Sequence, residues 1–254
     1  MVTNCEICLN HRYSNPKEPL IPTEILDYPW QIIGTDLFTW DNKNYLIVVD
    51  YYSKYFEVKQ INSMNSTAVI NQIKGIMARW EISEKVISDN GPCYMSQEFA
   101  EFAKNWDFKH ETISPYHSQS NGLAEKYVSV CKRILTKSKD SKSDPLIGIL
   151  EYRNSPLESG YSPAQLATGQ QLRSFLPTSR EKLQPTLVPP NLVKENIRLC
   201  KEKDKSYYDR QSKPLESLEI GQRARIQQPD KSWEPVTVIE KPNERSYTMY
   251  SPIP

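Results

Sequence analysis

Between residues 30 and 135 the hydrophobic pattern of the chain changes its period in a fixed order. Three stretches of strand composition come first, joined by short polar segments, which predicts an antiparallel meander of strands at 30–40, 45–50 and 55–61. Helical spacing then alternates with short strands. The elements expected next are a helix that Ser66 caps, a strand at 85–88, a helix around 99–106, a strand at 108–113 and a helix at 123–135. The order βββαβαβα predicts an α/β fold, with a mixed five-stranded sheet flanked by helices.

The composition excludes several classes of protein. With 32 Lys and Arg against 31 Asp and Glu the formal net charge is +1, so any nucleic-acid-binding surface has to be local. No apolar run approaches the roughly eighteen residues of a membrane span, and no membrane partner is expected. The five cysteines do not form a disulfide framework, which favours a reducing, intracellular location.

The chain divides into four predicted stretches. Residues 1–19 carry a pair of cysteines in loop-like sequence, and residues 20–180 hold the alternating strands and helices. Residues 181–213 begin with a proline cluster and continue as a polar, partly helical linker. Residues 214–254 consist of short strands between glycine and proline turn signals.

Three acidic residues stand at unusual places in this pattern. Asp36 lies inside the first strand, where aspartate is disfavoured, Asp89 ends the fourth strand, and Glu125 begins the long helix. Three carboxylates that meet at strand ends and a helix start would repel one another strongly without a cation. Oxygen ligands favour Mg²⁺ or Mn²⁺, and a pair of such ions serves phosphodiester chemistry. The alternative is local, because Asp-Asn-Gly is also typical of a turn and a glutamate in a first helical turn complements the helix dipole.

Two motifs connect these carboxylates to a known family. Ile87-Ser-Asp-Asn-Gly-Pro and Ser114-Pro-Tyr-His-Ser-Gln-Ser-Asn-Gly-Leu-Ala-Glu-Lys resemble the catalytic core of retroviral and gypsy-type retrotransposon integrases. The 35 residues between Asp89 and Glu125 match the spacing of the family's D,D-35-E signature. Shorter similar segments extend the resemblance over residues 25 to 180.

The resemblance implies an RNase H-like fold in which Asp36, Asp89 and Glu125 are the catalytic residues and metal ligands, with two Mg²⁺ or Mn²⁺ ions when DNA is bound. The implied function is that of an integrase, which performs 3′-end processing of element DNA and strand transfer into target DNA. It also implies a nuclear location, a homo-oligomer and chromatin as a further partner. Two alternatives stay open: a non-catalytic, host-retained descendant that binds DNA or chromatin, and a hydrolytic nuclease of the same fold. The carboxylates themselves do not distinguish joining from hydrolysis.

A basic surface beside the carboxylates is the expected DNA interface. The long helix carries mostly positive charge and starts at the predicted metal site, which favours phosphate contact over a merely solvated face. The loop that enters this helix is expected to contact the DNA end. The predicted nucleic-acid-binding residues are Gln119, Ser120, Asn121, Lys126, Lys132 and Arg133.

Asp50, at the end of the second strand, is a candidate fourth carboxylate of the kind that a ribonuclease H uses. The family resemblance instead implies that Asp50 belongs to a turn or supports the metal ligands. On that interpretation, alanine at this position leaves activity near the wild-type level.

Both ends of the chain depart from the family pattern. Cys5 and Cys8 form only half of a zinc site, and His11 would add one ligand of the four that a structural zinc needs, so no zinc is expected. Residues 1–19 are interpreted as a truncated remnant of the family's zinc module. Residues 214–254 resemble the family's small terminal β-barrel and break off within it, as expected of a polyprotein fragment or a degraded copy.

Overall fold

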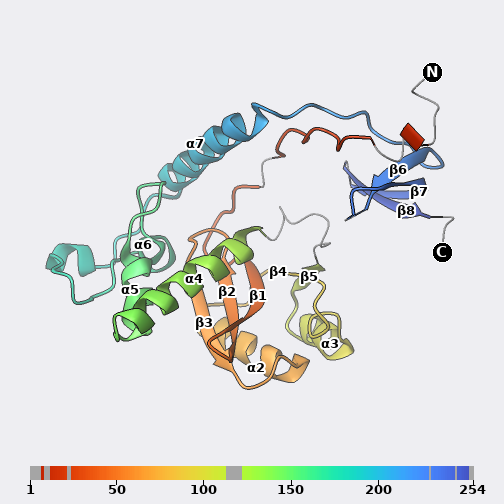
Figure 1. The fold of residues 1–254 in the computed structure, drawn as a ribbon. Helices are drawn as coiled ribbons and strands as arrows, with labels where there is room; N and C mark the ends of the chain where they lie inside the picture. Colours follow the sequence, from red (N-terminus) through yellow and green to blue (C-terminus); the bar gives the residue numbers. More distant parts are fainter. Residues whose placement is uncertain are drawn as a thin grey trace. The chain divides into compact units, whose positions relative to one another are not determined.

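The computed structural model describes residues 7–8, 12–21, 24–112, 122–228, 230–243 and 245–251 (Figure 1). The chain divides into two compact units. Glu24–Cys200 form the larger unit, and Met1–Thr23 together with Lys201–Pro254 form the smaller one.

The larger unit is built on a five-stranded sheet with the strand order β3-β2-β1-β4-β5. The strands are β1 (Ile32–Trp40), β2 (Lys43–Asp50), β3 (Phe56–Ile61), β4 (Lys85–Ser88) and β5 (Lys109–Thr112). Antiparallel pairing joins β1, β2 and β3, whereas β4 runs parallel to both β1 and β5. The predicted mixed sheet and its element order are confirmed.

A tight hairpin connects β1 to β2 and sets the register of the meander. Asp41 and Asn42 have φ angles of 50° and 58°. A two-residue loop with both φ angles positive matches the twist of the flanking strands, and aspartate and asparagine adopt this conformation more readily than other side chains. The hairpin register places Asp36 opposite Ile47.

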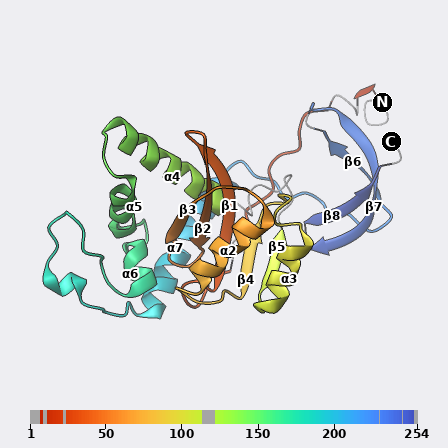
Figure 2. The ribbon, with the colours of Figure 1, turned by 90° about the horizontal axis from the view of Figure 1, so that it is seen from below.

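Helices cover both faces of the sheet (Figure 2). On one face lie α2 (Ser66–Met77) and α3 (Gln97–Asn105), and on the other lie α4 (Gly122–Asp140) and α5 (Pro145–Asn154). The expected cap of α2 was wrong by one residue. The side chain of Asn65 accepts the N–H of Ala68 and caps the helix. Ser66, the residue expected to cap it, is instead the first residue of the helix.

Strand β2 is buried on both of its faces. Leu46 and Val48 pack with α2 and α3, while Ile47 and Val49 pack with α4. Alternate side chains of a strand point to opposite faces, so a strand covered on both sides needs a continuous apolar run. The uninterrupted apolar stretch of β2 in the sequence has this cause.

Two further helices end the larger unit. A capping box between Ser162 and Gln165 begins α6 (Pro163–Thr168). A loop with the 3-10 turn η2 (Arg180–Leu183) leads to α7 (Pro190–Asp209), which lies in the region where the sequence predicts a linker helix. Among the described residues, no helix combines the length and the apolar composition that a membrane crossing needs.

The smaller unit combines the two ends of the chain. Its antiparallel sheet consists of β6 (Arg223–Gln227), β7 (Trp233–Asn243) and β8 (Ser246–Tyr250), in that order. Residues from the amino-terminal end pack against this part: the carbonyl of Arg12 accepts the indole N–H of Trp233, and the carbonyl of Lys17 accepts the N–H of Lys213, each at 2.8 Å. The two ends therefore fold together.

Candidate active site

Asp36 lies on β1 beneath helix α4. Alternate residues of a strand share a face, so Asp36 points to the same side as Gly34 and Phe38. A Cβ atom at Gly34 would lie 3.6 Å from the Cβ of Ala124 on α4. Further along the same helix, Lys132 Nζ lies 5.6 Å from the centre of the Phe38 ring. Asp36 is thus half-buried between two contacts that β1 makes with α4.

Asp89 directly follows β4 and lies beside Asp36. The parallel pairing of β1 with β4 sets Gly34 opposite Ile87. Continued by two residues, the same register sets Asp36 next to Asp89. The Asp89 side chain is exposed, and its Oδ1 accepts the N–H of Gly91 at 3.0 Å, which orients the carboxylate.

Glu125 projects from the first turn of α4. The preceding residue, Ala124, is completely buried and seats this turn on β1 at Gly34. Glu125 itself is exposed. The third carboxylate is therefore carried by the helix that covers Asp36.

The three carboxylates interact electrostatically. The pKa of Asp36 is raised to about 6, first by burial and then by the negative charges of Asp89 and Glu125. The N–H of Leu37, which lies 2.7 Å from Asp36 Oδ1, and the charge of Lys132 act in the opposite direction. The charges of Asp89 and Glu125 therefore both act on Asp36, which is consistent with the site that the sequence predicts.

The donor atoms of this site suit a hard divalent cation. Carboxylate oxygens are the ligands that Mg²⁺ and Mn²⁺ prefer, and a cation would offset the repulsion that raises the pKa of Asp36. Within the described ranges, no three His, Cys, Asp or Glu side chains stand close enough together to form a ready-made metal cage. Like charges repel, so binding of an ion would have to draw these side chains together.

Several predicted residues fall outside the described part of the chain. They are Gln119, Ser120 and Asn121 of the expected DNA-contacting loop, and Cys5 and His11 of the zinc half-site. Cys8 is described and is exposed. The roles of these residues stay predictions.

The predicted basic residues of α4 differ in their surroundings. Lys126 and Arg133 are exposed, whereas Lys132 is partly buried over the Phe38 ring. Lys132 follows Glu125 by seven residues, so the two side chains lie on the same face of the helix, two turns apart. A cation in this position would meet a phosphate group held at the carboxylates.

Asp50 is completely buried at the end of β2. Its Oδ1 accepts the N–H groups of Trp30 and Tyr52 at 2.8 and 3.0 Å. Its Oδ2 accepts the N–H of Ser53 at 2.8 Å and also the Ser53 hydroxyl. Burial raises the pKa of Asp50, and these hydrogen bonds act against that increase. All four donors belong to Trp30 and the turn after β2, which supports the interpretation of Asp50 as a turn residue.

Two hydrogen bonds near the aspartates have no signal in the sequence. Thr35 Oγ1 and Tyr94 Oη, both buried, lie 3.0 Å apart and tie β1 to the segment that follows Asp89. Ser88 Oγ lies 2.9 Å from His110 Nε2 across the β4–β5 pair. No motif spacing relates these residues, and only the tertiary structure reveals that they are partners.

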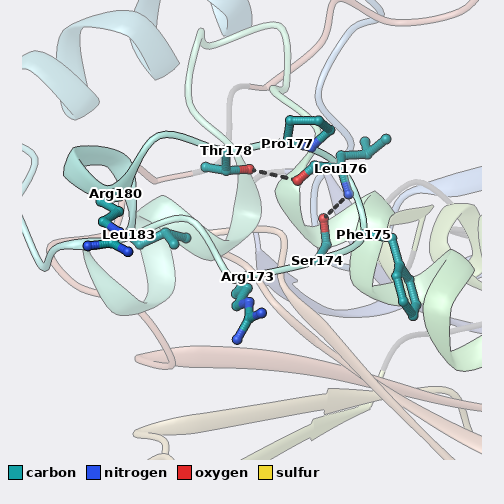
Figure 3. Close-up of a pocket in the computed structure, with 8 residues that line it drawn as sticks. All are labelled: Arg173, Ser174, Phe175, Leu176, Pro177, Thr178, Arg180 and Leu183. Atoms are coloured by element: carbon teal, nitrogen blue, oxygen red, sulfur yellow. Dashed lines mark hydrogen bonds between the residues drawn. The ribbon is translucent and has the colours of Figure 1, made fainter.

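A pocket of about 530 Å³ involves none of the three carboxylates. It is formed by the loop between α6 and α7 (Figure 3), and its lining residues are Arg173, Ser174, Phe175, Leu176, Pro177, Thr178, Arg180 and Leu183. Ser174 Oγ accepts the N–H of Leu176, and the carbonyl of Leu176 accepts the hydroxyl of Thr178, both at 3.3 Å. The loop is thus held by its own polar groups, and the pocket is not the predicted site.

Gly34→Ala is expected to lower activity more than stability. The added Cβ would lie 2.8 Å from Tyr51 Cε2, so the Tyr51 ring would have to shift beside the turn of α4 that carries Glu125. A displacement of about 1 Å at a reacting group can cost about 10²-fold in rate, whereas overpacking costs about 1–3 kcal/mol of stability. Thermal melting and a metal-dependent DNA-joining assay measure the two effects.

Gly75→Ala is the matched control, because a Cβ at Gly75, in α2, meets nothing within 4 Å. This variant is expected to keep full activity and to be slightly more stable. Wild-type activity in Gly34→Ala would show that the Tyr51 ring moves without disturbing the turn of α4 that carries Glu125.

The fold and a family match of one segment indicate the class of protein. A mixed sheet with carboxylates on β1, after β4 and at the start of α4 is the arrangement implied by the resemblance to integrases. Residues 29–118 match the family model of the integrase core domain. This segment belongs to the integrase core domain family, and it contains both Asp36 and Asp89.

The chain is similar to parts of longer proteins. An uncharacterized protein of Caenorhabditis elegans is 31% identical over 198 residues, which cover 74% of this chain and 16% of that protein. The retrovirus-related Pol polyprotein from transposon gypsy of Drosophila melanogaster is 27% identical over 165 residues, which cover 61% of this chain and 16% of the polyprotein. The chain therefore spans less than one fifth of the length of these relatives.

A solved structure supports the fold. One chain in the cryo-EM structure of the simian T-cell lymphotropic virus intasome in complex with PP2A regulatory subunit B56 gamma superposes with a TM-score of 0.63. The sequence identity is 16%, and the match covers 97% of this chain and 84% of that one. The fold predicted from the sequence is confirmed, and the predicted family is confirmed for residues 29–118.

Proposed function

We propose that this chain is the integrase part of a retrotransposon-type polyprotein and inserts element DNA into target DNA by divalent-metal-dependent phosphoryl transfer. The observation that carries the proposal is the β1–β4 register, which sets Asp89 beside Asp36, together with the charges of Asp89 and Glu125, which add to the effect of burial on the pKa of Asp36. Relatives from Drosophila melanogaster and Schizosaccharomyces pombe are polyproteins of transposons, which supports DNA joining over other phosphate chemistry.

The three carboxylates would hold Mg²⁺ or Mn²⁺ through their oxygen atoms. When bound, two such ions activate the attacking oxygen and stabilise the leaving oxygen of a phosphodiester. Asp36 has to be ionised to act as a ligand, and the charge of Lys132 favours the ionised form. Asp89 is oriented by the N–H of Gly91 and Glu125 extends from a helix, so the main chain at both ligands is set, and a bound ion would draw the carboxylates together.

Two displacements would take place at this site in succession. In 3′-end processing, water attacks a phosphodiester near the end of the element DNA and frees a 3′-hydroxyl. In strand transfer, that hydroxyl attacks a phosphodiester of the target DNA, and the 3′-oxygen of the cut target strand leaves. Lys132, over the Phe38 ring and near Asp36, would bind a non-bridging phosphate oxygen in both steps.

The DNA interface proposed for this reaction extends along α4. Exposed cations there would contact phosphates without reading the base sequence, and their contribution would weaken as the salt concentration rises. The residues assigned to it are Lys126, Lys132 and Arg133, together with Gln119, Ser120 and Asn121 of the preceding loop. We further propose that the chain acts in the nucleus as a homo-oligomer and that chromatin is an additional partner.

A reaction on labelled branched DNA tests the proposed function. The full chain is incubated with Mg²⁺ or Mn²⁺, and cleavage and joining are scored on one gel. Glu125→Gln should lower both by about 10³-fold, because a metal ligand contributes several kcal/mol of transition-state stabilisation. Glu98→Gln, the same substitution at an exposed position on α3, is the matched control and should keep wild-type activity.

Each alternative function predicts a different set of products on the gel. Joined product that disappears in Glu125→Gln supports an integrase. Cleavage without joining contradicts it in favour of a hydrolytic nuclease. Salt-sensitive DNA binding without any metal-dependent reaction would identify a DNA-binding descendant that has lost catalysis.

A further inference from the structure

We propose that His110 is a positioning residue, which fixes the main chain at Asp89 through the hydroxyl of Ser88. The inference rests on the proposed function, because it assigns His110 a role in holding one of the three carboxylates in place. His110 itself lies on β5 and is not a metal ligand in this proposal.

The geometry is a short chain of hydrogen bonds across two parallel strands. Strands β4 and β5 pair Val86 with His110. His110 Nε2 lies 2.9 Å from Ser88 Oγ, and Ser88 Oγ donates to the carbonyl of Asp89 at 2.8 Å. A serine hydroxyl has one proton to donate. Because that proton goes to the Asp89 carbonyl, the hydroxyl accepts the Nε2–H of His110.

The surroundings of His110 favour one protonation form. The imidazole is half-buried, with its centre 4.6 Å from the centre of the Phe99 ring and 6.4 Å from that of Tyr94. Burial lowers the pKa of His110, so the ring is neutral near pH 7 and carries one N–H. The hydrogen bond to Ser88 selects Nε2 as the protonated nitrogen.

This chain of hydrogen bonds acts where the β-ladder stops. Strand β4 ends at Ser88, so the carbonyl of Asp89 lies just beyond the paired residues. Ser88 is completely buried and supplies that carbonyl with a donor. The Asp89 carboxylate is held separately by the N–H of Gly91. Main chain and side chain at Asp89 are thus fixed independently, and His110 orients the group that fixes the main chain.

Isosteric variants separate positioning from packing. His110→Phe keeps a ring against Phe99 but removes the N–H, whereas His110→Gln keeps a neutral N–H donor. Ser88→Ala removes the relay itself. Ser83→Ala is the matched control, because Ser83 is a buried serine whose hydroxyl has no hydrogen-bond partner within the described part of the chain.

The first measurement is Mn²⁺ binding to the full chain by calorimetry, together with its melting temperature. His110→Phe and Ser88→Ala should each weaken Mn²⁺ binding about 10-fold, which is the usual effect of losing a group that orients a metal ligand. The double variant should be no weaker than either single variant, because both act through one path. His110→Gln should recover most of the affinity, and Ser83→Ala should keep all of it. Lower melting temperatures with unchanged Mn²⁺ affinity would overturn the proposal, and so would additive losses in the double variant.

The second measurement is the ¹⁵N NMR spectrum of the imidazole, which needs neither metal nor activity. The wild-type ring should show protonated Nε2, and Ser88→Ala should shift the ring toward a mixture of tautomers. A wild-type ring protonated at Nδ1 would overturn the proposal. If the wild type and Glu125→Gln bind Mn²⁺ equally weakly, the proposed function fails, while the NMR result still decides whether His110 holds Ser88.

Discussion

Asp36→Asn is expected to make the metal-free protein more stable while it abolishes metal-dependent activity. A pKa of about 6 in place of the usual 3.8 means that folding disfavours the ionised form of Asp36 by roughly 3 kcal/mol. Solvent screens part of this effect at a half-buried side chain, so a gain of about 1–2 kcal/mol is expected. The amide oxygen can still accept the N–H of Leu37. Opposite effects on stability and activity are typical of a group placed for function.

The pH dependence of this gain has a definite sign. The folded-state pKa of Asp36 lies above its unfolded value, so the folded chain binds the proton more tightly between about pH 4 and pH 6. The contribution of Asp36 to the free energy of unfolding of the wild type therefore rises as the pH falls through 6. Above pH 6 the ionised side chain destabilises the folded chain by the full amount. The stability difference between Asp36→Asn and wild type should be largest at pH 8 and absent below about pH 4.

Melting curves at pH 4, 6 and 8 in a chelator measure this difference. Glu98→Gln should show no such trend and serves as the control. Added Mn²⁺ should stabilise the wild type and not Asp36→Asn, because only the wild type keeps all three carboxylates. A stability difference that does not change with pH would contradict the assigned origin of the penalty.

Asp50→Ala is expected to destabilise the larger unit by about 3–5 kcal/mol, the usual cost of removing one partner from a buried charged network. The substitution leaves buried N–H groups of Trp30, Tyr52 and Ser53 without their acceptor. The melting temperature should fall by about 10 °C. Circular dichroism or tryptophan fluorescence would measure it.

Asp50→Asn makes this prediction sharper. An amide has one acceptor and one donor, so it cannot accept from donors at both oxygen positions as the carboxylate does. Asparagine should therefore destabilise the protein at Asp50 and stabilise it at Asp36. The folded Asp50→Asn variant should still bind Mn²⁺ and join DNA near the wild-type level. Loss of metal binding in the folded variant would instead make Asp50 part of the metal site.

Local sequence patterns were sufficient to predict the elements, and together with the family resemblance they led to the three carboxylates as candidates. The hairpin between β1 and β2 follows from Asp41 and Asn42, which tolerate positive φ angles. The apolar run of β2 and the stripe along α4 follow from side-chain period, which each segment carries in its own residues. Residue types at strand ends and helix starts then indicated a cation site, and the resemblance to integrases, with its 35-residue interval, connected Asp89 with Glu125.

The tertiary structure alone decided how these groups act on one another. The half-burial of Asp36 beneath α4, and with it the raised pKa, depends on the packing of the first turn of α4 on β1 near Gly34. The pairing of His110 with Ser88 depends on the register of two parallel strands. Burial, dielectric environment and hydrogen-bond partners are properties of packed neighbours from distant parts of the chain, so no local spacing encodes them.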